Sequence, residues 1–339
     1  MLSSLVVLYL LGLTSLSWAE TTPFTCSGVN RGFVFVKPNA VTPSAISLVK
    51  SKLASFGIEV VDEGTLAAKE IDERGLIDTH YGSIASKAVQ LSPRELMVTP
   101  EASAKFLAVF DEPYEAALAA GKVLSAKEAC AALAVDEAGL GNAWEALKAG
   151  TSLVKFGGGF YAGRINEYYV INGFYMAMRA LYVTPPASIV WMCVEWPESS
   201  LSWKAFRADV VGATDPRKAS ASSIRRALFD AWRDLGLPGE PSVKENGLHA
   251  SASPLEALAE RANWLGLQGL RADPFAAELL GALTAEAPNP GMTDAAAQSE
   301  VRSWFADPPA KGDGPGGLFD LLEDMDTSEC ITALLGQVQ

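Results

Sequence analysis

Histidine, paired cysteine and long apolar runs are scarce in this chain, and each scarcity excludes a class of protein. The 339 residues include only two histidines, His80 and His249, and four cysteines, none of them in a Cys-x-x-Cys pair. These counts exclude a multi-histidine metal centre and a thiolate zinc site. After the N-terminal segment no apolar run approaches the about 20 residues that cross a bilayer, so we expect no stable membrane span.

Positive charge is also in short supply. The chain has 27 Lys+Arg against 40 Asp+Glu, for a net charge of -13. Contacts to nucleic-acid phosphates need a surplus of Lys and Arg, so we expect no nucleic-acid partner. The composition, 49% hydrophobic and 20% charged, is that of a folded globular protein. Single cores stop growing at roughly 250 to 300 residues, which predicts one main domain with appended segments or a second small domain.

Residues 1–19 have the pattern of a cleavable secretory signal peptide. They carry no charged side chain, contain a short apolar run and end in the small-x-small sequence Ser17-Trp18-Ala19. An uncleaved N-terminal anchor is the alternative. A signal peptide predicts a secretory or extracellular location, where disulfides can form. Cys26 and Cys330, near opposite ends of the mature chain, could form one, although sequence does not assign the pairing.

Short strands and helices alternate along most of the chain, which predicts an α+β fold. The expected elements are a strand at 32–36, a helix between Thr42 and Gly57, a strand at 58–61, a strand at 188–196, a helix at 201–211, a strand at 246–250 and a helix at 253–264. Their order predicts a ferredoxin-like antiparallel sheet with helices on one face.

The segment between the second and third of these strands is expected to be an inserted all-α subdomain. Ser92 with Glu95 and Ser125 with Glu128 have the spacing of capping boxes, and the alanine-rich sequence behind each predicts a short helix. The triple glycine at 157–159 lacks the Gly-Lys-Ser/Thr that would complete a phosphate-binding loop. It therefore predicts a tight turn.

The C-terminal part is acidic. Residues 271–339 hold three basic and twelve acidic residues, and 307–317 has the composition of a flexible linker. Leu318, Phe319 and Leu322 among acidic neighbours predict an amphipathic segment that either docks on the domain or binds a protein partner. The predicted organisation is a signal peptide at 1–19, a first part of the main domain at 20–84, a helical insertion at 85–165, a second part at 166–270 and an acidic extension at 271–339 with a linker at 306–317.

His249 is the strongest candidate for chemistry. It ends a predicted strand just before the helix capped by Ser253, whose free N–H groups favour an anion. A neutral imidazole, with a reference pKa of about 6.5, is a competent nucleophile at pH 7. Glu260 lies on a helix face from which it could orient the ring. Taken alone, a histidine near a helix start is more often structural than catalytic.

Several motifs occur in the order found in nucleoside diphosphate kinases. They are the segment 33–41 with Lys37-Pro38-Asn39, His80-Tyr81, Gly212-Ala213-Thr214-Asp215-Pro216, Ser223-Ile224-Arg225, and Asn246-x-x-His249-x-Ser251-x-Ser253 followed by Glu260. Over 33–81 and 174–266 the chain resembles this family, and the histidine motif with its spaced glutamate is the most specific part.

The resemblance implies a phosphotransferase that works in two half-reactions. A nucleoside triphosphate would phosphorylate His249, and the phosphohistidine would then phosphorylate a nucleoside diphosphate, with Mg²⁺ held mainly by the nucleotide phosphates. Such chemistry depends mostly on positioning and charge neutralisation. By motif position, Ser251 and Glu260 would support the imidazole, Lys37 and Arg225 would neutralise phosphate charge, and Tyr81, Thr214 and Asn246 would donate hydrogen bonds to phosphate or ribose.

Each of these residues also has an ordinary structural interpretation. Lys37 could be a solvated lysine at a strand end, Tyr81 a core aromatic, Arg225 a surface charge and Thr214 a turn residue. Two alternatives to the enzyme therefore stay open. One is a non-catalytic nucleotide-binding or scaffold protein that retains the fold, and the other is a luminal interaction protein.

The sequence departs from the family pattern in several places. Asn39 stands where the family has aspartate. The second phosphate arginine is expected at Ala208, whereas Arg207 lies one residue earlier and so about 100° round a regular helix. In the family an aromatic side chain stacks on the base. Its position falls where the insertion rejoins the main domain, so Phe174 or Tyr175 is the candidate, and packing in the core is the alternative interpretation of either residue. The insertion and a longer 226–245 stretch predict that the family's hexamer is lost, although another homo-oligomer is compatible.

Overall fold

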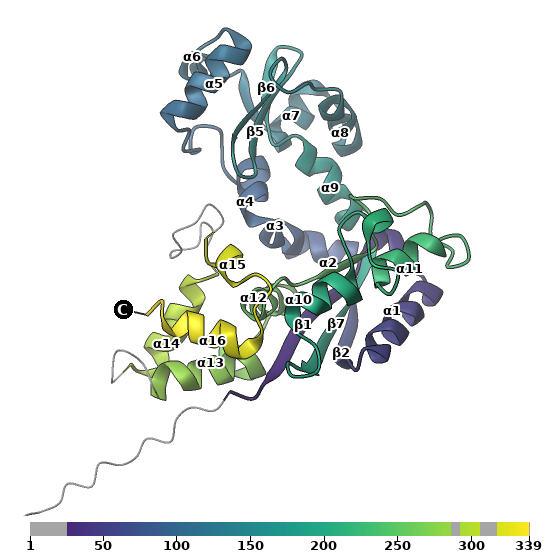
Figure 1. Cartoon of the computed structure of the whole chain (residues 1–339). Coiled ribbons are helices and arrows are strands. Elements are labelled where there is room, and N and C mark those ends of the chain that lie inside the picture. Colours follow the sequence, from purple (N-terminus) through teal and green to yellow (C-terminus); the bar gives the residue numbers. More distant parts are fainter. Residues whose placement is uncertain (1–25, 286–291, 306–316, 339) are drawn as a thin grey trace, which may run out of the picture.

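The computed structural model describes residues 26–285, 292–305 and 317–338. The predicted signal peptide at 1–19 and nearly all of the predicted linker at 306–317 lie outside these described residues. The chain forms a core around one sheet, an insertion around a second sheet, and a helical C-terminal extension beside the core (Figure 1). No helix in the described ranges combines the length and the apolar character that a membrane span requires.

The core sheet has four strands and the predicted ferredoxin-like topology. Its strands are β1 (Val29–Val36), β2 (Glu59–Ala67), β7 (Ser188–Pro197) and β8 (Leu248–Ala250). They lie in the order β2-β7-β1-β8, and every neighbouring pair is antiparallel. The α+β fold class predicted from the sequence is therefore confirmed.

Helices join these strands and are capped by the residues that the sequence suggested. The core helices are η1 (Pro38–Ala40), α1 (Pro43–Ser55), α2 (Ala68–Glu73), α3 (Leu76–His80), α9 (Phe174–Val183), α10 (Trp203–Ala205), the π-helix η3 (Phe206–Val211), η4 (Pro216–Lys218), α11 (Ile224–Asp230) and α12 (Pro254–Leu265). Thr42 accepts from the Ala45 amide at the start of α1, and Ser253 accepts from the Glu256 amide at the start of α12.

The sheet is covered on both faces, which corrects the expectation of helices on one face. Side chains alternate along a strand, yet all four residues from Phe33 to Val36 of β1 are fully buried. On one face the Phe35 ring lies 5.3 Å from the Trp264 ring of α12. Val49 and Leu53 of α1 belong to the same core. Residues 33–36 form a continuous apolar run, as expected for the part of β1 that is buried on both sides.

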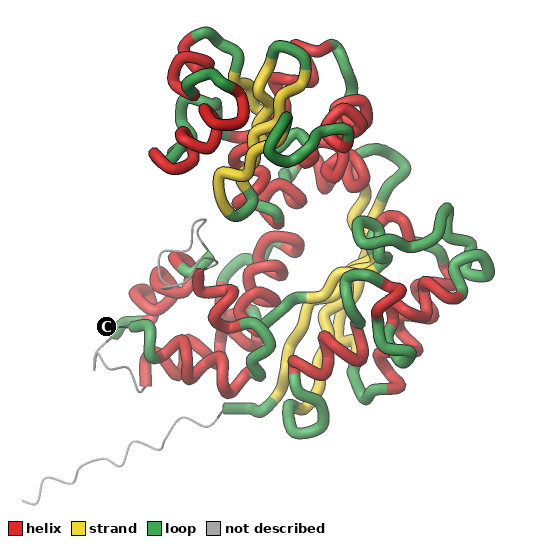
Figure 2. Tube along the Cα trace, turned by 45° about the horizontal axis from the view of Figure 1, so that its top comes forward, coloured by secondary structure: helices red, strands yellow, loops and turns green. Residues whose placement is uncertain are grey.

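The insertion is not all-α, because it contains a second sheet. Its elements are α4 (Gly82–Ala85), the π-helix η2 (Ser86–Gln90), α5 (Pro100–Phe110), α6 (Tyr114–Ala119), β3 (Val123–Ser125), α7 (Ala126–Leu133), α8 (Glu137–Glu145), β4 (Leu153–Gly157), β5 (Phe160–Ile165) and β6 (Tyr168–Ile171). The strands lie in the order β3-β6-β5-β4, apart from the core sheet (Figure 2). Strands of three to six residues show little periodicity beside alanine-rich helices, which explains the error.

Local sequence signals in the insertion have mixed outcomes. The capping box of Ser125 and Glu128 is present at the start of α7. Ser92 and Glu95 do hydrogen-bond, but they close a turn, and the next helix begins only after Thr99. The predicted tight turn at the triple glycine is confirmed, since it joins β4 to β5 with Gly159 at φ 59°.

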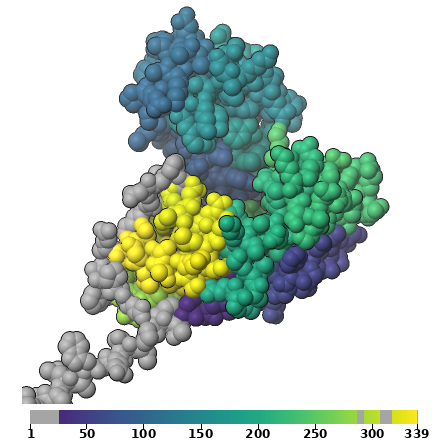
Figure 3. All heavy atoms as spheres, viewed as in Figure 1, coloured from purple at the N-terminus to yellow at the C-terminus, as the bar shows by residue number. Residues whose placement is uncertain are grey.

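The acidic extension folds into a helical unit that docks on the core. Its helices are η5 (Leu270–Ala272), α13 (Pro274–Ala285), α14 (Asp294–Ser303), α15 (Gly317–Leu322) and α16 (Thr327–Leu335). Leu318 and Leu322 of the predicted amphipathic segment are buried with Leu255 and Leu258 of α12. Of the two alternatives, docking is the one found, and the yellow C-terminal residues lie against the green core in Figure 3.

Polar contacts fix this extension in place. Asp326 Oδ1 accepts from Asn30 Nδ2 at 2.7 Å and from the Trp203 amide at 2.6 Å. The Thr327 amide donates to Asn30 Oδ1 at 2.9 Å. All four cysteines are free thiols, so Cys26 and Cys330 pack in the same apolar cluster without a disulfide. Beyond the continuous backbone, the contacts that join the described part of the extension to the core are therefore non-covalent.

We expect Asp326→Ala to lower the free energy of unfolding by about 3 kcal/mol. The change leaves the buried Asn30 amide and the Trp203 N–H without an acceptor and removes the cap of α16. Urea unfolding followed by far-UV circular dichroism measures the effect. The control is Asp320→Ala, an exposed carboxylate on α15 whose loss should cost less than about 0.5 kcal/mol. Equal stability of the two variants would contradict this account of the docking.

Candidate active site

His249 is held at the edge of the core sheet by its neighbours on β1. The strand β8 pairs with β1 so that His249 lies opposite Phe35, and the imidazole stacks on the Phe35 ring at 4.5 Å between centroids and 22° between planes. The side chain is 16% exposed, so one part of the ring still reaches solvent. Sheet pairing and ring stacking together fix the plane of the imidazole.

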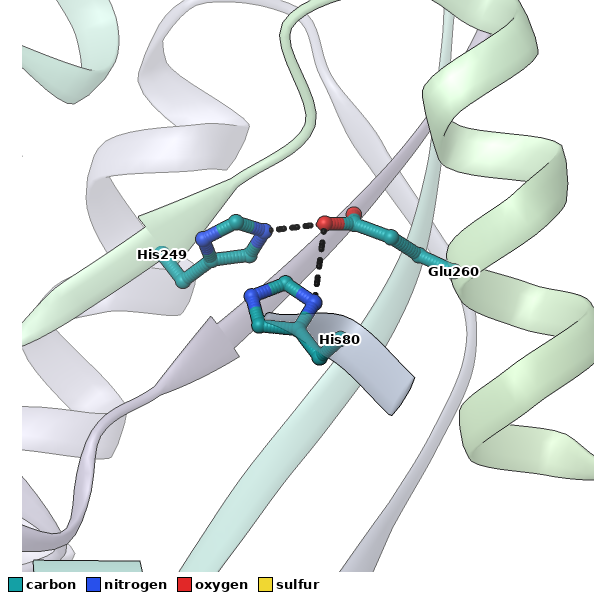
Figure 4. A group of neighbouring side chains, drawn as sticks. All are labelled: His80, His249 and Glu260. Carbon is teal, nitrogen blue, oxygen red and sulfur yellow. Dashed lines mark hydrogen bonds and ion pairs between the residues drawn. The ribbon is translucent and has the colours of Figure 1, made fainter. Parts of the chain in front are cut away.

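A carboxylate from α12 fixes the rotation of that ring. His249 Nε2 lies 2.6 Å from Glu260 Oε1 (Figure 4). The other carboxylate oxygen accepts from Ser251 Oγ at 2.5 Å, and the Phe33 amide donates to the same hydroxyl at 3.3 Å. When Glu260 is ionised its carboxylate only accepts, so that Nε2 carries the proton and Nδ1 keeps its lone pair. The predicted trio of His249, Ser251 and Glu260 is thus brought together.

His80 belongs to the same cluster, although the sequence analysis gave it no role. Its Nδ1 lies 3.4 Å from Glu260 Oε1, and its ring is 4.7 Å from the His249 ring (Figure 4). Trp264 Nε1 approaches the same nitrogen at 3.5 Å. The only sequence signal was its place in the His80-Tyr81 motif. The structure therefore adds a second imidazole that packs beside the candidate nucleophile.

These three side chains also bring together atoms that could bind a metal ion. Two histidines are enough for such a site when a carboxylate joins them. Ligand atoms of His80, His249 and Glu260 all lie within 4.8 Å of one another. Zinc bonds of about 2.0 to 2.2 Å place neighbouring tetrahedral ligand atoms more than about 3 Å apart. The 2.6 Å contact between His249 and Glu260 is shorter than that spacing. The observed arrangement is a hydrogen-bonded cluster.

Burial and nearby positive charge keep His249 neutral. Burial lowers its pKa well below the usual 6.5, and the charges of Lys37 and Arg225 lower it further. Burial also lowers the pKa of His80 to about 3, with the charge of His249 next in effect. Burial raises the pKa of Glu260 to about 7, against the opposing effects of His80 and the Ser251 hydrogen bond. At pH 7 the His249 imidazole is therefore in its nucleophilic form.

Two cations stand close to this imidazole. Lys37 directly follows β1, and burial followed by the charge of Arg225 lowers its pKa to about 8. Arg225 of α11 donates to the Leu248 carbonyl at 3.0 Å and to the Gly212 carbonyl at 2.7 Å. Burial lowers the pKa of Arg225 to about 10. Two cations so close, each with a lowered pKa, form a site in which an anion would be stabilised.

Two cavities lie beside this centre. The aromatic cavity, of about 680 Å³, is lined by Lys37, Tyr81, Trp144, Phe174, Met178 and Tyr182, among others. The basic cavity, of about 470 Å³, is lined by Lys204, Arg207, Thr214, Lys218, Arg225, Glu323 and Asp324, among others. Lys37 lines the first and Arg225 lines the second, and both act on the pKa of His249. His249 itself lines neither cavity, but its neighbour Ala250 lines the basic one.

The two predicted stacking aromatics have different positions. Tyr175 has no exposed surface, and its hydroxyl donates to Asp78 Oδ1 at 2.7 Å, so its assignment to a nucleotide site is wrong. Phe174 lines the aromatic cavity. Trp144 of α8, which the sequence analysis missed, lines the same cavity, with its ring 5.8 Å from that of Phe174. No motif marks Trp144, because it comes from the insertion.

Asn246 and Thr214 lie together, in agreement with their proposed shared site. Asn246 Nδ2 donates to the Thr214 carbonyl at 3.2 Å, while its Oδ1 is buried without a hydrogen-bond partner among the described residues. An unpaired buried oxygen is costly. Because this oxygen is buried, a ligand would reach it only if the neighbouring groups moved.

Arg207 reaches the basic cavity because the helix before Gly212 is offset. The Gly212 amide donates to the Arg207 carbonyl, five residues earlier, at 3.0 Å, which is the hydrogen bond of a π-helix. The extra residue in this turn compensates for the one-residue shift, and Arg207 lines the cavity with Thr214 and Arg225. Arg207 Nη1 lies 2.6 Å from Glu323 Oε1 and 2.6 Å from Asp324 Oδ1.

Comparison with known proteins finds similar solved structures but no match by sequence. No family model and no curated protein matches it. Solved structures that match include a nucleoside diphosphate kinase from Encephalitozoon cuniculi, 15% identical over 70% of this chain and 90% of that one, with a TM-score of 0.34. An Aquifex aeolicus nucleoside diphosphate kinase is 12% identical over 69% and 94%, with a TM-score of 0.34. A Pyrobaculum aerophilum NDP kinase is 17% identical over 70% and 95%, with a TM-score of 0.35. The likeness is distant, and the function is inferred below from the site.

We expect Lys37→Gln to raise the pKa of His249, because the Lys37 charge disfavours the imidazolium. An NMR titration of the two histidine side chains measures this, with His80→Gln to assign the signals. The control is Lys50→Gln, which removes a lysine that pairs with Glu63 on the surface. A His249 pKa unaffected by either variant would contradict the electrostatic account.

Proposed function

We propose that this protein is a nucleoside diphosphate kinase-like phosphotransferase that carries the transferred phosphate on His249. The observation that carries the proposal is one imidazole with Nε2 held by Glu260, Nδ1 available, and Lys37 and Arg225 beside it. A neutral histidine in a cationic site suits attack on phosphorus and does not suit a structural ion pair.

The first half-reaction would begin with the Nδ1 lone pair of His249. An N–P bond forms to the γ-phosphorus while the bond from that phosphorus to the β,γ-bridging oxygen breaks, and the nucleoside diphosphate leaves with the bond electrons. The phosphorylated ring keeps its Nε2 proton and gains positive charge, which the Glu260 carboxylate would stabilise. The second half-reaction is the reverse, with a different nucleoside diphosphate as acceptor.

The cavities suggest how a nucleotide would lie. Its base would enter the aromatic cavity beside Phe174 and Trp144, where a planar ring finds aromatic walls. Its phosphates would lie between Lys37 and Arg225, in reach of Arg207 from the basic cavity. Tyr81, Thr214 and Asn246 are proposed to contact phosphate or ribose. Positioning of this kind supplies most of the catalysis in phosphoryl transfer.

Mg²⁺ is proposed to arrive with the nucleotide. The carboxylates near His249 already have partners, since Glu260 contacts His249 and Ser251, and Glu323 and Asp324 contact Arg207. The donor set therefore fits an ion held by phosphate oxygens, and such an ion would neutralise part of the phosphate charge.

Label transfer tests the proposed nucleophile. Incubation of residues 20–339 with Mg²⁺ and γ-labelled ATP should give an acid-labile, alkali-stable adduct that added diphosphates discharge. His249→Gln should abolish it, whereas His80→Gln should retain it, because His80 is buried and its Nδ1 faces Glu260. Nucleotide binding without an adduct would instead favour the non-catalytic binding protein, and an adduct that survives in His249→Gln would sink the assignment.

Glu260→Gln should slow adduct formation by about 100-fold, because the negative charge that stabilises the phosphorylated ring is lost. The wild-type rate should rise with pH through about 7, as Glu260 ionises, and the variant should lack this step. The matched control is Glu256→Gln. Burial, followed by the charge of Glu260, raises the pKa of Glu256, and this carboxyl of the same helix hydrogen-bonds neither His249 nor Ser251 among the described residues, so its amide should slow adduct formation far less. Equal rates for both variants would contradict the role of Glu260.

A further inference from the structure

The basic cavity contains a pair of carboxylates that the proposed chemistry does not require. Four cations line it, Lys204, Arg207, Lys218 and Arg225, and Glu323 and Asp324 of the C-terminal extension line it with them. Both carboxylates approach the same nitrogen, Nη1 of Arg207, at 2.6 Å each. The other N–H groups of this guanidinium, on Nε and Nη2, make no hydrogen bond within the described residues and remain available to an anion.

The position of these carboxylates is built into the fold. The Asp324 amide donates to the Ala252 carbonyl at 3.0 Å, three residues after His249, and the Asp324 backbone is left-handed with φ 68°. Two residues later Asp326 is anchored to the Trp203 amide. On the other side Leu322 is fully buried against the core of the extension. The backbone that carries the pair is therefore held beside the cavity, while the side chains of Glu323 and Asp324 are 48% and 37% exposed.

A carboxylate pair in this position changes which anions the cavity favours. It offsets two of the four positive charges that line the cavity at pH 7. Repulsion between these carboxylates and a phosphate group grows with the charge of the phosphate, and this repulsion is only partly screened in a cavity. Removal of the two carboxylates would therefore increase the affinity for the most highly charged ligand most.

We infer that Glu323 and Asp324 are specificity-determining residues that weaken the binding of phosphate chains in proportion to their charge. The inference rests on the proposed function, because it assigns the basic cavity to the phosphates of that reaction. It gives the acidic extension a role in the site, that of limiting how tightly triphosphates are held relative to diphosphates.

The test uses inorganic phosphate, pyrophosphate and tripolyphosphate, which probe the cavity without a nucleoside. Isothermal titration of residues 20–339 at low salt should show tripolyphosphate binding tighter to Glu323→Gln/Asp324→Asn than to the unmodified chain, by on the order of tenfold. The gain should be smaller for pyrophosphate and smallest for phosphate. It should shrink as salt is added. Arg207→Gln should weaken all three anions.

A matched control separates local from general charge effects. Asp320→Asn removes one charge from α15 at an exposed residue outside the cavity and should change affinity far less than Glu323→Gln does. The inference would be overturned by an equal gain in affinity for all three anions or by no gain at all. It would also be overturned if none of the anions bound to the unmodified chain or to any variant. These outcomes can be told apart from failure of the proposed function, because label transfer to His249 tests that function separately. Thermal melting of each variant excludes unfolding as the cause.

Discussion

The hydrogen bond between His249 Nε2 and Glu260 Oε1 is the interaction on which the rest of the site depends. It joins the edge strand β8 to helix α12 at 2.6 Å, inside a cluster that is almost closed to water. This hydrogen bond fixes the tautomer of the imidazole. The Glu260 carboxylate that accepts it is itself held by Ser251. Without it, the ring would keep its stacking on Phe35 but lose the orientation that leaves Nδ1 available.

The surrounding fold positions the other side chains of the candidate site. Strand pairing brings His249 opposite Phe35, helix α11 brings Arg225 to the carbonyls beside it, and the π-helix brings Arg207 to the same cavity. The insertion and the extension each contribute one wall, with Trp144 on the aromatic side and Asp324 on the basic side. Both added parts therefore border the candidate site.

The sequence predicted the core well because its signals are local. A capped helix after Thr42, an apolar central strand and a histidine before Ser253 all follow from short-range pattern. The second sheet was missed because its strands are short and lie among alanine-rich helices. His80, Trp144 and the contact of Arg207 with the extension could not be predicted, since each depends on tertiary packing between distant segments.

The nitrogen that carries phosphate tests the account most directly. After reaction with ATP and Mg²⁺, ¹⁵N and ³¹P NMR of chain labelled at histidine distinguishes the two ring nitrogens. The geometry predicts a single phosphohistidine, at Nδ1 of His249, because Nε2 is occupied by Glu260. Phosphate on Nε2, phosphate on His80, or no phosphohistidine under conditions where ATP binds would contradict the central claim.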